Sequence, residues 1–140
     1  AQLEKIGLKV DMQPMDWQTL VTRRTKKDPT DAGGWSVFST FWAGLDQYNP
    51  VGHAFLRGIG DAAGSAPGWP TSPAIESLRD KWMDAPDLAA QKSIARELQL
   101  QAMQDVPYVP LGQVFQPIAH RDNLTGILNG FVLFWNVRKV

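Results

Sequence analysis

Apolar and polar positions at the start of the chain change from a helical spacing to strict alternation and back again. Residues 1–6 favour a helix that ends at Gly7, and residues 8–13 alternate with the period of a half-buried strand. Pro14 closes this strand because proline has no amide hydrogen to donate. Asp16 then stands as the N-cap of a helix whose apolar positions recur every three or four residues and which stops at Asp28-Pro29. The pattern predicts the order helix, strand, helix.

A second strand is predicted over residues 35–42, which are rich in bulky, β-favouring side chains. We expect it to pair with the first strand in one sheet. The run ends in a turn that contains Asp46, Asn49 and Pro50, and ligands of open α/β sheets bind beyond the carboxyl ends of strands. The alternative is that the acid and the amide only form the turn, and that Trp42 is core.

The middle of the chain predicts a long loop followed by a helical hairpin. Residues 58–70 are small residues and helix breakers, after a short helix near residues 50–56. A helix then starts at Pro73, behind a hydroxyl cap in Thr71-Ser72. A second helix runs from residues 84–87 to residue 106, where Pro107 ends it.

The C-terminal part predicts extended chain over residues 109–114 and a closing strand over residues 131–137. Together with the helices, these strands predict a mixed α/β fold. The 140 residues are 44% apolar, which is enough for one domain with a core.

Charge and composition exclude several classes of function. Fourteen basic and fourteen acidic residues leave no net charge, which disfavours nucleic acid as a partner. No apolar run approaches the about eighteen residues of a membrane span, so direct membrane insertion is not expected. The absence of cysteine excludes disulfides and thiolate metal sites.

Motifs for catalysis are also missing. His53 and His120 lack the spacing of metal ligands, and no nucleophile elbow or phosphate-binding lysine loop occurs. We therefore predict no metal, no cofactor and no enzyme activity, although a carboxylate pair assembled only by folding would be invisible in the sequence.

Several short motifs carry a resemblance to a known family. They are Ile6-Gly7-Leu8-Lys9-Val10, Asp16-Trp17, the aspartate and proline of Asp46 to Pro50, Ser72-Pro73, and Val106-Pro107-Tyr108-Val109-Pro110-Leu111. In this order they resemble the C-terminal part of the solute-binding proteins of peptide-type ABC importers, extracellular solute-binding protein family 5. The match covers nearly the whole chain, and these relatives are several times longer.

The resemblance implies a two-lobed, periplasmic-binding-protein-like fold of the dipeptide-binding type, truncated here at the N-terminus. Residues 1–112 would form the second lobe, and residues 113–140 a tail that returns toward the missing first lobe. Apolar residues of the 128–137 tail would pack on that lobe, and without it we expect self-association of the fragment.

The resemblance also implies a function. Such a protein captures a peptide-like or related small solute in a cleft between its lobes and delivers it to permease subunits. It is periplasmic, or a membrane-anchored extracellular lipoprotein in organisms without a periplasm. The alternatives are a sensor or regulatory domain that reuses this lobe, or an enzyme with a cryptic site.

One residue role transfers from the family with its motif. In peptide binders, an aspartate four residues before a proline pairs with the α-ammonium group of the ligand, and Asp46 and Pro50 match it. A tryptophan shortly before the aspartate lines the pocket in relatives; Trp42 matches it with one extra residue between them. Tyr48 and Asn49 are further candidate ligand contacts.

Overall fold

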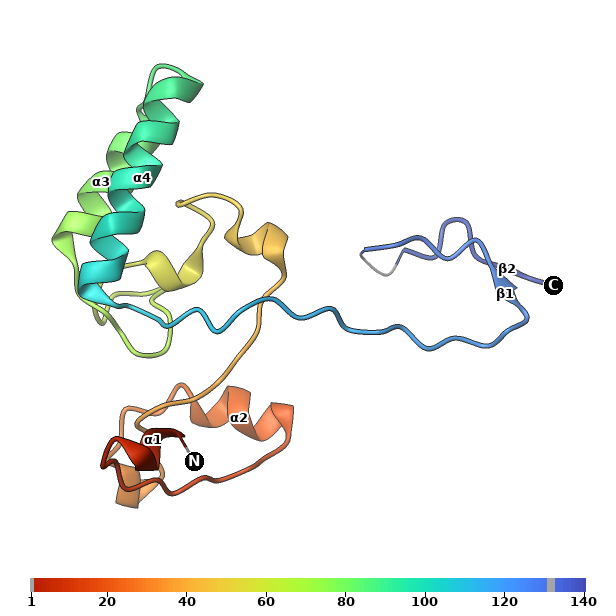
Figure 1. The fold of residues 1–140 in the computed structure, drawn as a ribbon, viewed down its shortest axis with the longest axis horizontal. Helices are drawn as coiled ribbons and strands as arrows, with labels where there is room; N and C mark the ends of the chain where they lie inside the picture. Colours follow the sequence, from red (N-terminus) through yellow and green to blue (C-terminus); the bar gives the residue numbers. More distant parts are fainter. Residues whose placement is uncertain (1, 131–132) are drawn as a thin grey trace. The chain divides into compact units, whose positions relative to one another are not determined.

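Two units make up the chain in the computed structural model, which describes residues 2–130 and 133–140. The first unit is Ala1–Val109 and the second is Pro110–Val140. Figure 1 shows that most of the helices belong to the first unit. The predicted turn that contains Asp46, Asn49 and Pro50, called the candidate turn below, lies in this unit.

The first two helices begin and end at signals present in the sequence. Helix α1 (Gln2–Lys5) is followed by Gly7, whose φ of +87° is a left-handed conformation that glycine adopts without strain. Helix α2 (Trp17–Arg23) is capped by Asp16, whose side chain accepts a hydrogen bond of 3.1 Å from the Thr19 amide. Both predicted helices are confirmed, although α2 ends before the predicted stop at residues 28–29.

The strand predicted over residues 8–13 is not formed. These residues have no regular secondary structure, and Met12 is 81% exposed. Among the described residues, no backbone hydrogen bond joins residues 9–13 to another segment. The alternation of apolar and polar residues indicates only which side chains favour burial. A strand also needs a partner for its amides and carbonyls.

The prediction of a buried, paired strand over residues 35–42 is also wrong, because this segment too lacks a backbone partner among the described residues. This segment is also without regular structure, and Val37 and Phe41 are exposed. Its aromatic rings pack locally instead: the Trp35 and Phe38 centroids are 4.6 Å apart, and those of Trp17 and Phe41 are 5.1 Å apart. The bulky residues are therefore used in ring contacts rather than in a sheet.

Three short 3-10 helices interrupt the irregular segments. They are η1 (Thr30–Ala32), η2 (Gly44–Gln47) and η3 (Ala54–Leu56). The loop predicted over residues 58–70 is present and closes with an antiparallel bridge between Ile59 and Thr71. Gly58 lies so close to this junction that an added Cβ would stand 2.6 Å from the Ser72 carbonyl oxygen.

The predicted helical hairpin is confirmed. Helices α3 (Pro73–Met83) and α4 (Leu88–Asp105) lie side by side (Figure 1), capped by Ser72 and Asp87. Ile75 and Leu98 are almost completely buried, at 0% and 1% exposure, so the core of the first unit centres on this hairpin.

In the part of the second unit that the structure describes, two strands form a small antiparallel sheet. Strands β1 (Leu124–Thr125) and β2 (Arg138–Lys139) pair Leu124 with Lys139 and Thr125 with Arg138. Residues 109–120 are without regular structure, as predicted for residues 109–114. The strand predicted over residues 131–137 begins outside the described residues, and its described part, residues 133–137, is turn and irregular chain.

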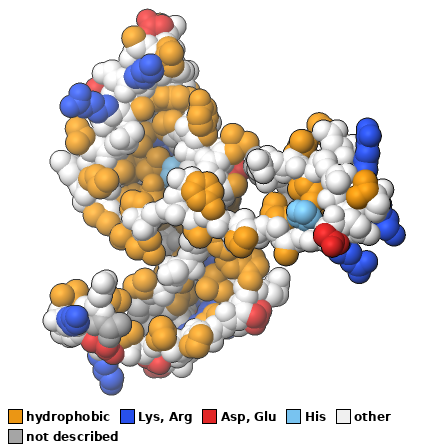
Figure 2. All heavy atoms as spheres, turned by 45° about the vertical axis from the view of Figure 1, so that its right-hand side comes forward, with side chains coloured by type: hydrophobic (Ala, Val, Ile, Leu, Met, Phe, Trp, Pro, Cys, Tyr) orange, Lys and Arg blue, Asp and Glu red, His pale blue; other side chains and the backbone are white. Residues whose placement is uncertain are grey.

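The fold is thus mixed in helix and strand content, as predicted, but its strands lie elsewhere. Hydrophobic side chains are spread over the visible surface (Figure 2). In residues 2–130 and 133–140, no helix is both long enough and apolar enough to cross a membrane.

Candidate functional site

The candidate turn begins with η2, which carries Asp46 on its surface. The Asp46 amide donates to the Ala43 carbonyl at 3.0 Å, which closes the 3-10 turn. The Asp46 side chain is exposed, and among the described residues its carboxylate has no hydrogen-bond or ion-pair partner. Its four acceptor sites are therefore available to a cation.

Trp42 is the aromatic neighbour that packs against the body of this unit. Its ring meets Phe55 edge to face, with the centroids 5.6 Å apart and the planes at 90°. The Trp42 side chain nevertheless remains 41% exposed. The ring is thus held on one side and is open to solvent on another.

Tyr48 and Asn49 differ in their surroundings. Tyr48 is 82% exposed, and none of the described rings packs on it. The Asn49 side-chain oxygen accepts hydrogen bonds from the Val51 and Gly52 amides, at 3.0 and 2.8 Å. Asn49 therefore stabilises the turn. This is the role that the alternative interpretation of the sequence, in which the acid and the amide only form the turn, gave it.

The four predicted residues lie within residues 42–49, but no hydrogen bond or ring contact joins their side chains to one another. Residues that the sequence did not single out hold the turn instead. His53 is buried, and its Nε2 lies 3.1 Å from the Tyr108 hydroxyl, although 55 positions separate the two residues. Only folding brings this pair together, so no local signal could have revealed it.

Burial changes the acid–base behaviour of this pair. Desolvation lowers the pKa of His53; hydrogen bonding to its own backbone opposes this in part, and the positive charge of Arg79 adds a smaller lowering effect. Desolvation also raises the pKa of Tyr108. The His53 Nδ1 atom is buried without a partner among the described residues. A neutral imidazole is therefore the favoured form.

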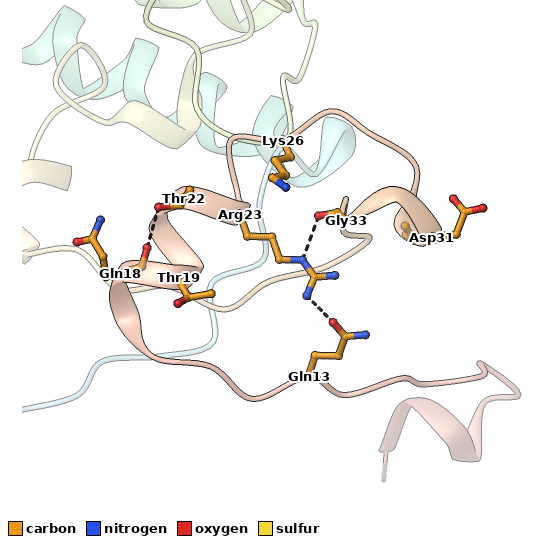
Figure 3. A pocket seen from close by; sticks show the side chains of 9 residues that line it. Gln13, Gln18, Thr19, Thr22, Arg23, Lys26, Asp31 and Gly33 are labelled. Carbon is orange, nitrogen blue, oxygen red and sulfur yellow. Dashed lines mark hydrogen bonds between the residues drawn. The ribbon is translucent and has the colours of Figure 1, made fainter.

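A separate hollow of about 600 Å³ lies beside α2 and η1 (Figure 3). Arg23 spans it and donates to the carbonyl oxygens of Gly33 and Gly34, at 3.2 and 2.8 Å, and to the Gln13 side chain. These bonds occupy the Arg23 guanidinium, while Lys26 and Asp31 also line the hollow. None of the four predicted site residues lines it.

The second unit has an apolar pocket of its own. It encloses about 310 Å³ and is lined by Ile118, Ala119, His120, Leu124, Ile127, Leu128, Leu133, Phe134 and Val137. Its lining carries little polar chemistry. Among the described residues, no group of three His, Asp or Glu side chains is arranged to hold a metal ion.

Comparison with known proteins places this geometry in context. No family model matches the chain. It is 39% identical over 140 residues to the "Probable peptide ABC transporter periplasmic-binding protein" of Sinorhizobium fredii (strain NBRC 101917 / NGR234). The match covers 99% of this chain and 26% of that protein, so the chain spans about a quarter of the length of its relative. The resemblance drawn from the motifs is thereby confirmed: over nearly all of its length, the chain is related to one section of a peptide ABC transporter periplasmic-binding protein.

Proposed function

We propose that this chain is part of the solute-binding component of an ABC importer and that it contributes one wall of a peptide-binding cleft. The relative's name states peptide transport and periplasmic binding, and 39% identity over the whole chain supports a shared role. In this proposal the protein acts by binding rather than by catalysis. It works in the periplasm, where it delivers its solute to permease subunits.

The proposed organisation follows the family resemblance. Residues 1–112 form most of the second lobe, and residues 113–140 form a tail that packs on the first lobe. The cleft closes around the solute when the lobes approach, as in other hinged binding proteins. The exposed residues 8–13 and the exposed Val37 and Phe41 agree with this arrangement, because partners outside the chain would give their apolar side chains a place to pack.

The exposed carboxylate of Asp46 is the observation that supports a peptide with a free amino terminus as the solute. It is an exposed carboxylate without a protein partner among the described residues, and it lies on a turn between Trp42 and Tyr48. A peptide's α-ammonium group loses its hydration in a closed cleft and needs a charge-assisted hydrogen bond in return. The two aromatic rings add apolar walls, worth about 0.5 to 2 kcal/mol if a cation meets a ring face.

The test uses the full-length gene product that contains these residues. A mixed tripeptide library with free amino termini is incubated with the protein, and retained peptides are quantified by mass spectrometry. The same library with acetylated amino termini serves as the matched probe, because acetylation removes the charge and leaves the side chains unchanged. We expect retention of the free-amine library over the acetylated one; equal retention, or none of either, contradicts the proposal.

A further inference from the structure

Helix α3 reaches the candidate turn through the side chain of Arg79. The Arg79 Nε atom donates to the Pro50 carbonyl oxygen at 3.0 Å, and Nη2 donates to the Val51 carbonyl oxygen at 3.1 Å. The rigid fork of a guanidinium matches two successive carbonyls better than a point charge does. Arg79 therefore fixes the end of the Asp46–Pro50 turn on the helix.

Glu76, one helical turn earlier, completes this arrangement. Both of its carboxylate oxygens accept from Arg79 Nη1 at 2.7 Å. Glu76 Oε1 also accepts from the Gly58 amide at 2.7 Å. The Glu76–Arg79 pair thus ties both ends of residues 50–58 to α3.

Burial separates this pair from an ordinary surface salt bridge. The side chains of Arg79 and Glu76 are 11% and 27% exposed. Surface pairs contribute little, whereas a pair largely removed from water depends on complete hydrogen bonding. Because four hydrogen bonds engage the guanidinium, a change at Arg79 should affect the carbonyls that it holds.

The turn itself transmits this position to Asp46. The Asn49 side chain accepts from the Val51 and Gly52 amides, and the His53 amide donates to the Asn49 carbonyl at 3.1 Å. The segment that Arg79 holds is therefore also stabilised by hydrogen bonds within the turn. Asp46 stands three residues before Asn49, next to the Tyr48 amide that donates to the Leu45 carbonyl, so we expect a shift at residues 50–51 to reach Asp46 through the backbone.

We propose that Arg79 is a positioning residue for solute binding: it holds the Pro50 and Val51 carbonyls so that Asp46 faces the solute's cationic group. This inference rests on the proposed function. Arg79 touches the turn and not the solute, so its effect passes through Asp46. Glu76 supports it by holding the guanidinium in place.

Arg79→Lys is the substitution that tests this role, because lysine keeps the charge but cannot donate to two carbonyls as a planar fork. Arg96→Lys is the matched control, since Arg96 is an exposed residue of the adjacent helix α4. Both variants are made in the full-length gene product.

The first measurement is amide hydrogen exchange and needs no solute. Peptides covering residues 49–58 should exchange roughly tenfold faster in Arg79→Lys, because a lost hydrogen bond to a charged group corresponds to about one power of ten. Peptides covering α4 should exchange as in the wild type. Unchanged exchange over residues 49–58 would overturn the positioning role.

The second measurement is the ratio of free-amine to acetylated tripeptides retained by the protein. Arg79→Lys should lower this ratio by about tenfold, by the same conversion, whereas Arg96→Lys should leave it unchanged. A purely structural loss would lower the retention of both libraries alike and leave the ratio intact. That result would overturn the inference.

A double-mutant cycle with Asp46→Asn shows whether the effect passes through Asp46. In the Asp46→Asn background, Arg79→Lys should change the ratio little further; a full independent effect would contradict the inference. Wild-type protein that retains neither library would contradict the proposed function, while the exchange rates would still decide whether Arg79 holds the turn.

Discussion

Ser72 joins the start of α3 to the end of α4 through its hydroxyl group. The Ser72 Oγ atom accepts from the Ile75 amide at 3.1 Å and donates to the Asp105 carboxylate. Ser72 is buried, and Gln101 also donates to Asp105, at 2.9 Å. One hydroxyl therefore caps one helix and links it to the next.

Ser72→Ala should destabilise the protein by about 1 to 2 kcal/mol, because it removes an N-cap and the hydrogen bond to Asp105. Urea denaturation followed by circular dichroism measures the loss. Ser77→Ala, on the exposed side of α3, is the control and should change stability little. Equal stability of the two variants would show that the Ser72 contacts contribute nothing.

Leu98→Ala should cost about 2 to 5 kcal/mol of stability, because it leaves a cavity in the hairpin core, where Leu98 is fully buried. Leu100→Ala on the same helix removes the same atoms from an exposed position. The difference between the two variants in urea denaturation isolates the effect of burial. Similar losses for both would contradict a core centred on Leu98.

His53 should make stability depend on pH. Its pKa is lowered in the fold, so below the ordinary value of about 6.5 the unfolded chain binds the proton more readily than the folded chain. The contribution of His53 to the free energy of unfolding is then fully present above about pH 6.5 and is lost as the pH falls through the lowered pKa of the folded chain. Urea denaturation is measured between pH 8 and pH 5, roughly the range in which histidine titrates. The free energy of unfolding should change less steeply with pH in His53→Gln than in the wild type.

His120→Gln serves as the control for this titration, since His120 is exposed. If His53→Gln also has the wild-type pH dependence, the buried His53 side chain does not govern the acid sensitivity.

Asp46→Asn should weaken the binding of the best-retained free-amine tripeptide by about 2 to 5 kcal/mol, the range for removing one member of a buried interfacial charge pair. Asparagine keeps the size of the side chain and its ability to form a turn, so folding should be preserved. Titration calorimetry of the full-length gene product measures the change. Asp80→Asn, on the exposed side of α3, should bind as the wild type does, and unchanged affinity in Asp46→Asn would remove the proposed anchor.

The isolated 140-residue chain should self-associate through its 128–137 tail. Phe134 and Trp135 are 74% and 84% exposed, and the predicted contribution of Phe131 lies outside the described residues. Replacing Phe134 and Trp135 together by serine should shift sedimentation toward the monomer, because exposed apolar area favours association. Leu100→Ser, in the other unit, is the control. A wild-type chain that stays monomeric at high concentration would contradict this prediction.

The sequence by itself determined where α2, α3 and α4 begin and where α1 ends, although α2 is shorter than predicted. Asp16, Ser72 and Asp87 all act as N-caps, and Gly7 follows α1 in a left-handed conformation. These signals are local, because a cap contacts amides two or three residues away and needs no distant partner. The turn that carries Asp46 was visible for the same reason.

Tertiary structure decided whether the extended segments became strands and what holds the turn. Residues 8–13 and 35–42 have the composition of strands but remain unpaired, since pairing needs another segment at hydrogen-bonding distance. Tyr108 meets His53 across 55 positions, and Arg79 meets Pro50 across 29. No periodicity or motif encodes such contacts, because they form only after the hairpin has brought distant residues together.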